Sequence, residues 1–179
     1  MRSRSSVSDS VTAGPAEVDW MVTITEPLPD CPSVHAGWER LATQSNWGEW
    51  RSESKLRGPD VATTIVPPAT EPLQAGDKYV VRIGSFIKIH CRVLESSTAA
   101  ATIGEGERMV FDAMGISLGG LVRARFRFTI FRGEDRVVMA RVQERIDSLS
   151  FLLPSKEILE NEHRHTLRDL NTSFVLPRQ

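Results

Sequence analysis

The sequence predicts an α+β protein in which an antiparallel sheet of about six to seven strands packs against one long C-terminal helix. Three observations support this prediction. Apolar and polar residues alternate along most of 79–146, as they do in a sheet with one buried face. Residues 155–176 instead show the period of a helix. A proline-rich break at 27–32 precedes a second, shorter stretch of helical spacing.

The chain is long enough for one domain with a sizeable core. It has 179 residues, of which 40% are hydrophobic and 25% charged, the balance of a globular protein. Residues 1–17 are rich in Ser, Arg and small residues, and they lack the apolar stretch of a signal peptide. We therefore expect a disordered tail over 1–17 and a single folded domain over 18–176.

The first strand is expected at residues 18–26, where β-favouring residues alternate with polar ones. The prolines of 27–32 end this strand. Apolar residues of 33–50 then fall at positions i, i+4 and i+7, and Ser33 is placed to cap a helix. Because Gly48 interrupts this spacing, the stretch predicts either one short helix or two short helices separated by a kink.

Two strands are expected at 61–66 and 78–83, on either side of a proline-rich loop. Over 79–93 the odd positions are mostly apolar, and the even positions carry basic residues that include Lys88 and His90. A turn in the middle of this run makes it a hairpin. A three-residue turn leaves Lys88 and His90 on the outer face, whereas a two-residue turn brings them inward. We favour three residues, because that length buries the apolar side chains of the second strand.

Residues 101–115 predict one or two further strands, and 121–146 form the clearest hairpin of the chain. Its first strand places Phe126 and Phe128 on one face and three arginines on the other. Its second strand has an apolar face that one acidic residue, Glu144, interrupts. The two apolar faces match only if the turn between them has an odd length, which places the turn at about 133–135.

The C-terminal helix has a start signal and two distinct faces. Ser155 is placed to cap it, and Glu157 and Glu160 suit the positive end of its dipole. Glu157, Arg164 and Arg168 fall on the polar face. The apolar stripe contains Leu159, His163, Leu167, Leu170 and Phe174, flanked by Thr166 and Ser173.

Composition excludes several classes of protein. A net charge of −1 gives no general attraction to nucleic acid or to anionic membranes. No run of about 18 apolar residues occurs from which a transmembrane helix could form. Cys31 and Cys91 are the only cysteines, so a disulfide framework is not expected. We expect a cytoplasmic protein without stable membrane insertion, either a monomer or a homodimer.

Four stretches carry a resemblance to a known family: VHAGWERLATQSNWGEW, LQAGDKYVVRIG, VLES at the end of a strand, and LPSKEILENEHRHTLRDL. Together with the order of the elements, they resemble the helix-grip arrangement of the START-like or SRPBCC superfamily. That superfamily includes birch-pollen-allergen-like and polyketide cyclase/dehydrase-like proteins. The resemblance covers about residues 18–176. It implies an antiparallel sheet wrapped around the C-terminal helix, with a hydrophobic cavity between them.

Within that implied arrangement, Trp38, Trp47 and Trp50 have two possible roles. Each brings on the order of 200 Å² to bury, and packing in the core is the simpler role. The alternative is that they form the wall or the gate of a ligand pocket. The other side chains expected to line the cavity are Tyr79, Ile89, Phe111, Phe126, Phe128, Met139, Leu159, Thr166, Leu167 and Leu170.

Glu144 and His163 are the candidate catalytic residues. His163 interrupts the apolar stripe of the helix, and Glu144 is the single acid on the inner face of the last strand. If they meet inside the cavity, one of them could act as a general acid or base. The favoured alternative is a buried pair with a structural role, or a histidine at the cavity rim. A buried polar group left unpaired would cost about 1–3 kcal/mol.

Two patterns suggest other partners, but neither holds. Glu160 and His163 form an E-x-x-H pattern, yet a carboxylate-bridged iron site needs a second such motif, and the sequence has none. His163 and His165 lie about 200° apart around a helix and so do not share an ion. We expect no metal and no cofactor. In 123–128 the alternation separates Phe126 from the arginines, which removes the aromatic platform that RNA would need, so no nucleic-acid partner is expected.

Two functions remain, and the resemblance supports both. The first is the binding of a small hydrophobic ligand, lipid-, polyketide- or terpenoid-like, between the sheet and the C-terminal helix. The second is a polyketide cyclase/dehydrase-like enzyme that uses acid/base chemistry in the same cavity. Binding is favoured, because only the Glu144–His163 pair supports catalysis.

Overall fold

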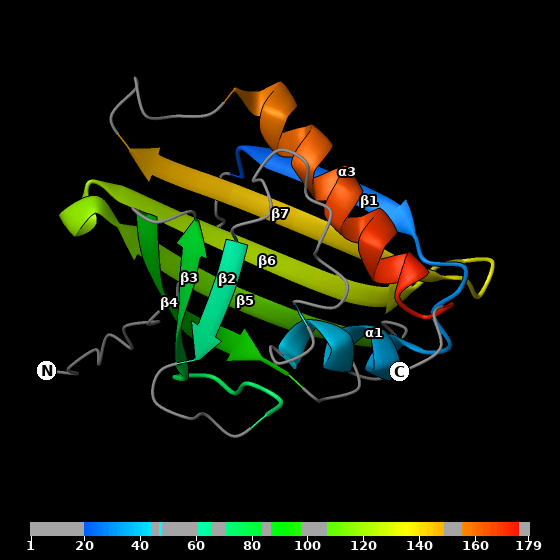
Figure 1. Ribbon diagram of the computed structural model, residues 1–179. Coiled ribbons are helices and arrows are strands. Elements are labelled where there is room, and N and C mark those ends of the chain that lie inside the picture. The colour runs from blue at the N-terminus through cyan, green and yellow to red at the C-terminus, as the bar shows by residue number, and fades with distance from the viewer. Residues whose placement is uncertain are drawn as a thin grey trace, which may run out of the picture.

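The computed structural model describes residues 20–43, 47, 61–65, 71–83, 87–97, 107–148 and 155–175. The predicted tail at 1–17 and Trp50 lie outside these residues. The strands are β1 (Val22–Pro27), β2 (Val61–Ile65), β3 (Lys78–Ile83), β4 (Ile87–Ser96), β5 (Arg108–Ser117), β6 (Val122–Arg132) and β7 (Val138–Ser148). The helices are α1 (Val34–Ala42) and α3 (Lys156–Thr172), with a short 3-10 turn η2 (Leu118–Gly120) (Figure 1).

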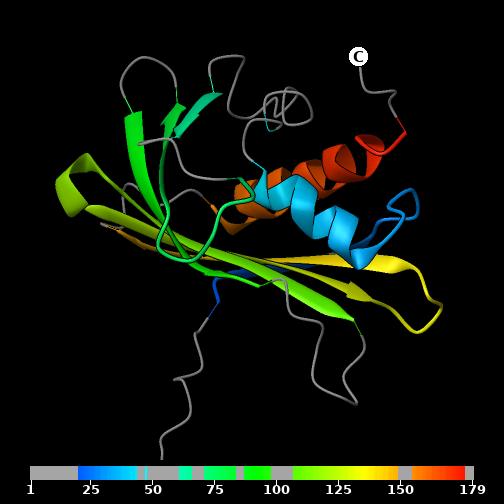
Figure 2. The same ribbon diagram turned by 90° about the horizontal axis from the view of Figure 1, so that it is seen from below.

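The described strands form one seven-stranded sheet with the order β1-β7-β6-β5-β4-β3-β2, and every neighbouring pair is antiparallel. Both helices lie on the same face of this sheet, and the sheet curves around them (Figure 2). α3 packs over the β1 edge, and α1 packs against β5 and β6. The α+β arrangement expected from the sequence, with a sheet wrapped around the C-terminal helix, is confirmed.

The β6–β7 hairpin has the register that the sequence predicts. Phe126 lies opposite Glu144, and Phe128 lies opposite Val142, so the two apolar faces coincide. The turn has an odd length, but it spans 133–137 and not 133–135. The two extra residues are needed because the Gly133 N–H closes the turn on the carbonyl of Val137, with Arg136 in the left-handed region at φ 61°.

The β3–β4 hairpin has the three-residue turn that the sequence analysis favours. Ile83 pairs with Ile87, which leaves three residues between the strands. Lys88 and His90 are exposed, and the buried Tyr79 lies on the opposite face. The open question of which way Lys88 and His90 point is therefore settled in favour of the outer face.

The boundaries of the first elements differ from the prediction. β1 covers Val22–Pro27 and not 18–26, because its pairing with β7 begins at Val22. α1 ends at Ala42, so a helix continuous over 33–50 does not form. Ser33 caps α1 as predicted, since its hydroxyl accepts a hydrogen bond from the Ala36 N–H at 3.1 Å.

The last elements follow their sequence signals closely. Of residues 101–115, the structure describes 107–115, and these contain the start of one strand, β5. The Ser155 hydroxyl accepts from the Ile158 N–H and caps α3. The predicted stripe of α3 is buried except for Phe174, which is half-buried. Glu162 is buried as well, and the sequence pattern did not single it out.

Two of the three arginines on the outer face of β6, Arg125 and Arg127, are paired with acids on neighbouring strands. Asp112 on β5 is completely buried, and its carboxylate accepts from Arg125 at 2.7 and 3.0 Å and from Arg127 at 2.8 Å. Arg127 also reaches Glu95 on β4. The hydrogen bond to Asp112 raises the pKa of Arg125. This cluster ties three strands together on the face of the sheet away from the helices.

Candidate functional site

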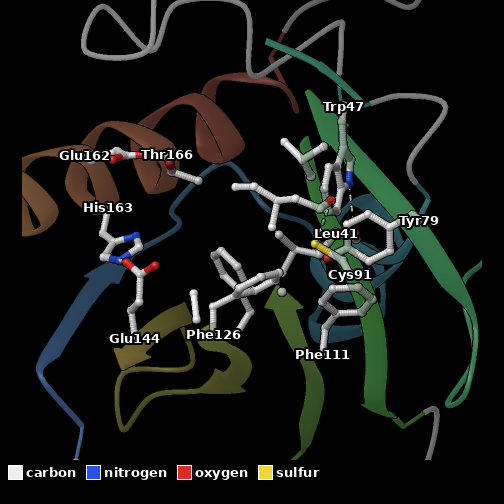
Figure 3. Close-up of a pocket in the computed structure, with 15 residues that line it drawn as sticks. Leu41, Trp47, Tyr79, Cys91, Phe111, Phe126, Glu144, Glu162, His163 and Thr166 are labelled. Carbon is white, nitrogen blue, oxygen red and sulfur yellow. Dashed lines mark hydrogen bonds and ion pairs between the residues drawn. The ribbon is translucent and has the colours of Figure 1, made fainter. Parts of the chain in front are cut away.

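A pocket lies between the concave face of the sheet and the two helices (Figure 3). Its cavity volume is about 80 Å³, within about 790 Å³ of empty space that is partly open to solvent. Both volumes exceed the space that one water molecule occupies, so the pocket has room for a small ligand. Its described lining consists of Leu41, Trp47, Tyr79, Val81, Ile89, Cys91, Phe111, Gly115, Ala124, Phe126, Phe128, Glu144, Glu162, His163 and Thr166.

One end of the pocket is aromatic. The Trp47 ring meets Tyr79 edge-on, with centroids 5.7 Å apart, and Phe111 nearly edge-on at 6.4 Å. The indole N–H of Trp47 donates to the carbonyl of Leu41 at 2.9 Å, at the end of α1. This hydrogen bond orients the indole and leaves its ring surface to form part of the wall. Trp47 is therefore placed where the pocket-wall role requires it.

The other end of the pocket is polar, and Figure 3 shows Glu144 and His163 facing each other there. Glu144 projects from β7 and His163 from α3, and the distance from His163 Nε2 to Glu144 Oε2 is 2.7 Å. Both side chains are less than 10% exposed. The sequence predicted that these two residues could meet inside the cavity, and the structure brings them together.

Two further polar side chains of α3 line the pocket beside this pair. Glu162 and Thr166 are both buried, one turn apart on the helix. Thr166 was predicted to lie there. Glu162 was missed, although it stands three residues after Leu159 and four before Thr166, a spacing that places it on the same helix face.

Small residues shape the floor of the pocket. Gly115 on β5 lies beside Ala124 on β6 and opposite Cys91 on β4. A Cβ atom at Gly115 would come within 2.7 Å of Ile89 Cγ2 and 3.3 Å of Cys91 Sγ. The absence of a side chain at Gly115 therefore lets Ile89 lie low against the sheet and keeps the space above it open.

The structure divides the predicted ligand-binding residues into two groups. The predicted residues that line the pocket are Trp47, Tyr79, Ile89, Phe111, Phe126, Phe128 and Thr166. Those that are buried in the core without lining it are Trp38, Leu159, Leu167 and Leu170. Trp38 donates from its indole N–H to the carbonyl of Val110 at 3.2 Å, which holds α1 on β5. The core-packing role therefore applies to Trp38.

Met139 is a correction to the predicted site. Strand alternation turns it away from the pocket, because its neighbours Val138 and Ala140 are the buried residues of β7. It pairs with Phe131 on the opposite face of the sheet and lies near Gly133. Ser173 does not line the pocket either, since its hydroxyl donates to the carbonyl of Leu170 within the helix turn.

The chemistry available in the pocket is that of carboxylate, imidazole and hydroxyl groups. In the part of the chain that the structure describes, no three His, Cys, Asp or Glu side chains gather as a metal site. Among the described helices, none has the length and apolarity needed to cross a bilayer. Cys31 and Cys91 are both buried, and neither is in a disulfide.

Comparisons with known proteins locate the fold but not the function. No protein-family model matches the chain, and no curated protein matches it either. Among solved structures, a START superfamily protein from Mycobacterium smegmatis is similar, with a TM-score of 0.58 and 11% identity over 86% of this chain and 96% of that one. Major latex-like protein 151 from Panax ginseng has a TM-score of 0.54 and 8% identity over 87% and 97% of the two chains.

The di-domain ARO/CYC StfQ of the steffimycin biosynthetic pathway is similar over 85% of this chain, with a TM-score of 0.56 and 11% identity. The match covers 44% of the StfQ chain. Identities this low establish the fold and no more. The protein therefore shares the fold of these proteins, the helix-grip arrangement that the sequence resemblance implied.

Proposed function

We propose that the protein binds a small hydrophobic ligand in the pocket between the sheet and α3. The observation that carries this proposal is the pocket itself, which has aromatic and aliphatic walls and a few polar groups gathered at one end. Small-molecule sites usually combine an apolar lining with a few placed polar groups. One structure of similar fold, StfQ, is an ARO/CYC protein of the steffimycin biosynthetic pathway, which is compatible with this use of the cavity.

Native mass spectrometry of the freshly purified protein, followed by organic extraction, tests the proposal. We expect a stoichiometric apolar adduct, or binding of an added neutral naphthalene compound when no adduct survives purification. The variant Ala124→Phe fills the pocket from β6 and should abolish either kind of binding. The matched control is Arg123→Phe, which adds the same ring one residue away on the exposed outer face. The proposal would be refuted if the wild-type protein carried no apolar adduct and also failed to bind the added naphthalene compound.

A second candidate function is supported by one specific contact. The 2.7 Å contact between His163 and Glu144 at the wall of the pocket supports a role for the two groups in proton transfer. In a cyclase/dehydrase-like enzyme, such a pair would move a proton to or from a bound polyketide-like substrate.

Ring closure of a linear poly-β-ketone surrogate, followed by ultraviolet absorption, tests this alternative. If His163→Gln and Glu144→Gln retain affinity for the surrogate and lose turnover, the pair is catalytic. If the wild-type protein binds the surrogate without converting it, simple binding stands.

A further inference from the structure

We propose that the pocket selects molecules whose polar end donates hydrogen bonds or carries positive charge, such as amines and alcohols on a flat aromatic body, and rejects carboxylates. This inference rests on the proposed binding function and adds the chemical class of the ligand. It follows from which hydrogen-bonding groups line each end of the pocket.

The polar end of the pocket consists mainly of acceptors. Glu144 presents two carboxylate oxygens, of which Oε2 contacts His163 Nε2 at 2.7 Å. When the imidazole is neutral and Nε2–H donates to Glu144, its other nitrogen is an acceptor. Glu162 adds a second carboxyl group to the lining. A ligand group that can only accept hydrogen bonds finds few partners here, whereas an amine or a hydroxyl finds several.

Glu162 also has an interaction within the protein. The inference does not require this carboxylate to be unpartnered, because an ionised carboxylate has about four acceptor sites and can serve a ligand as well as a protein neighbour.

The ionisable groups at this end of the pocket support the same ligand preference. The described ionisable groups that line this end are the carboxyl groups of Glu144 and Glu162 and the imidazole of His163. None of the described residues that line the pocket is a lysine or an arginine. A ligand carboxylate would therefore lie beside the carboxyl groups of Glu144 and Glu162, with no lysine or arginine among the described lining residues to pair with it.

The opposite end of the pocket favours an aromatic body. Figure 3 shows Trp47, Tyr79 and Phe111 at the end away from Glu144 and His163, with Phe126 between the two ends. Aromatic side chains pack well against another ring in edge-to-face or offset geometry. A ligand with an aromatic body and a donor group at one end would therefore satisfy both ends of the pocket.

Three probes that share one ring system test the inference. They are 1-naphthylmethylamine, 1-naphthalenemethanol and 1-naphthoic acid, which are cationic, neutral and anionic at neutral pH. Isothermal titration calorimetry with the wild-type full chain measures each dissociation constant at pH 7. We expect the amine and the alcohol to bind at least tenfold more tightly than the acid. Equal affinities, or tighter binding of the acid, would overturn the inference.

Charge-neutralising variants test whether Glu162 and Glu144 cause the preference for the amine over the acid. Glu162→Gln keeps the size of the side chain. It should reduce the ratio between the dissociation constants of the acid and the amine, here called the affinity gap, at least threefold. Glu144→Gln should do the same, and it provides a second reading if one variant folds poorly. The matched control is Glu157→Gln, an exposed residue in the first turn of the same helix, which should leave the gap unchanged. A gap that persists in both pocket variants would overturn the inference.

The outcomes also separate the inference from the function on which it rests. If none of the three probes binds to the wild-type protein, the proposed binding function fails and the inference fails with it. If all three bind equally well, the pocket binds small apolar molecules and only the inference is refuted.

Discussion

The contact between Glu144 and His163 predicts a strong coupling in stability. Glu144→Met leaves the imidazole unpaired, and His163→Leu leaves the carboxylate unpaired, each in a site less than 10% exposed. Removing one partner of a fully buried pair costs about 3–5 kcal/mol. Because the pair faces a pocket that can hold water, we expect about 2–3 kcal/mol for each single variant.

The double variant Glu144→Met/His163→Leu should be nearly as stable as the wild type. It removes both polar groups and leaves two apolar side chains of similar size in contact, so its stability should lie within about 1 kcal/mol of the wild type. Each single variant should lower the melting temperature by roughly 4–12 °C for a chain of this length. The double variant should recover most of the melting temperature that each single variant loses.

Urea unfolding followed by far-ultraviolet circular dichroism measures all four free energies of unfolding at one temperature. Two results would refute the reasoning. One is a loss below about 0.5 kcal/mol in both single variants, which would mean that water satisfies either group. The other is a double variant whose loss equals the sum of the two single losses, which would mean that the groups do not interact in the folded protein.

Three further predictions follow from other parts of the structure. Asp112→Asn keeps the shape of a completely buried side chain but removes its charge; because the partner Arg125 is about one-third exposed, the free energy of unfolding in urea should fall by only about 1–2 kcal/mol. Burial raises the pKa of the Cys31 thiol, so iodoacetamide at pH 8 should alkylate it about tenfold more slowly in the folded protein than in urea, as mass spectrometry would show. Because the folded pKa is the higher one, the stability that the thiol contributes is present below its unfolded pKa and declines as the pH rises above it. Gly37→Ala would bring a Cβ within 3.0 Å of Ile130 Cγ2, so thermal unfolding should show a loss of about 1 kcal/mol where an open helix site would gain from alanine.

The parts of the fold that could be predicted are those in which one face of an element is buried and the other is not. Alternation along β6 and β7 separates Phe126 and Phe128 from the arginines, and that separation determines the register. The meeting of Glu144 and His163 was predictable for the same reason. Each is a single polar residue on an otherwise apolar face, and both faces point into the same interior.

What could not be predicted depends on contacts between elements or on two buried faces. Along β5, residues 109–113 are all buried, so alternation does not reveal that Asp112 faces away from the pocket. Its pairing with Arg125 requires the β5–β6 register, which no local pattern encodes. Met139 was misplaced because an apolar residue can also pack on the outer face of a strand. Glu162 was missed because it lies at the edge of its helical stripe.

The glycine at the floor of the pocket has a consequence for how the site could diverge among related proteins. Because Ile89 Cγ2 occupies the volume that a Cβ at Gly115 would take, any larger residue there must displace Ile89. The shape of the pocket floor is thus controlled by Gly115 through the position of Ile89. A single substitution at Gly115 on β5 could then change the size of molecule that the pocket accepts, while the Glu144–His163 pair at the polar end stays intact.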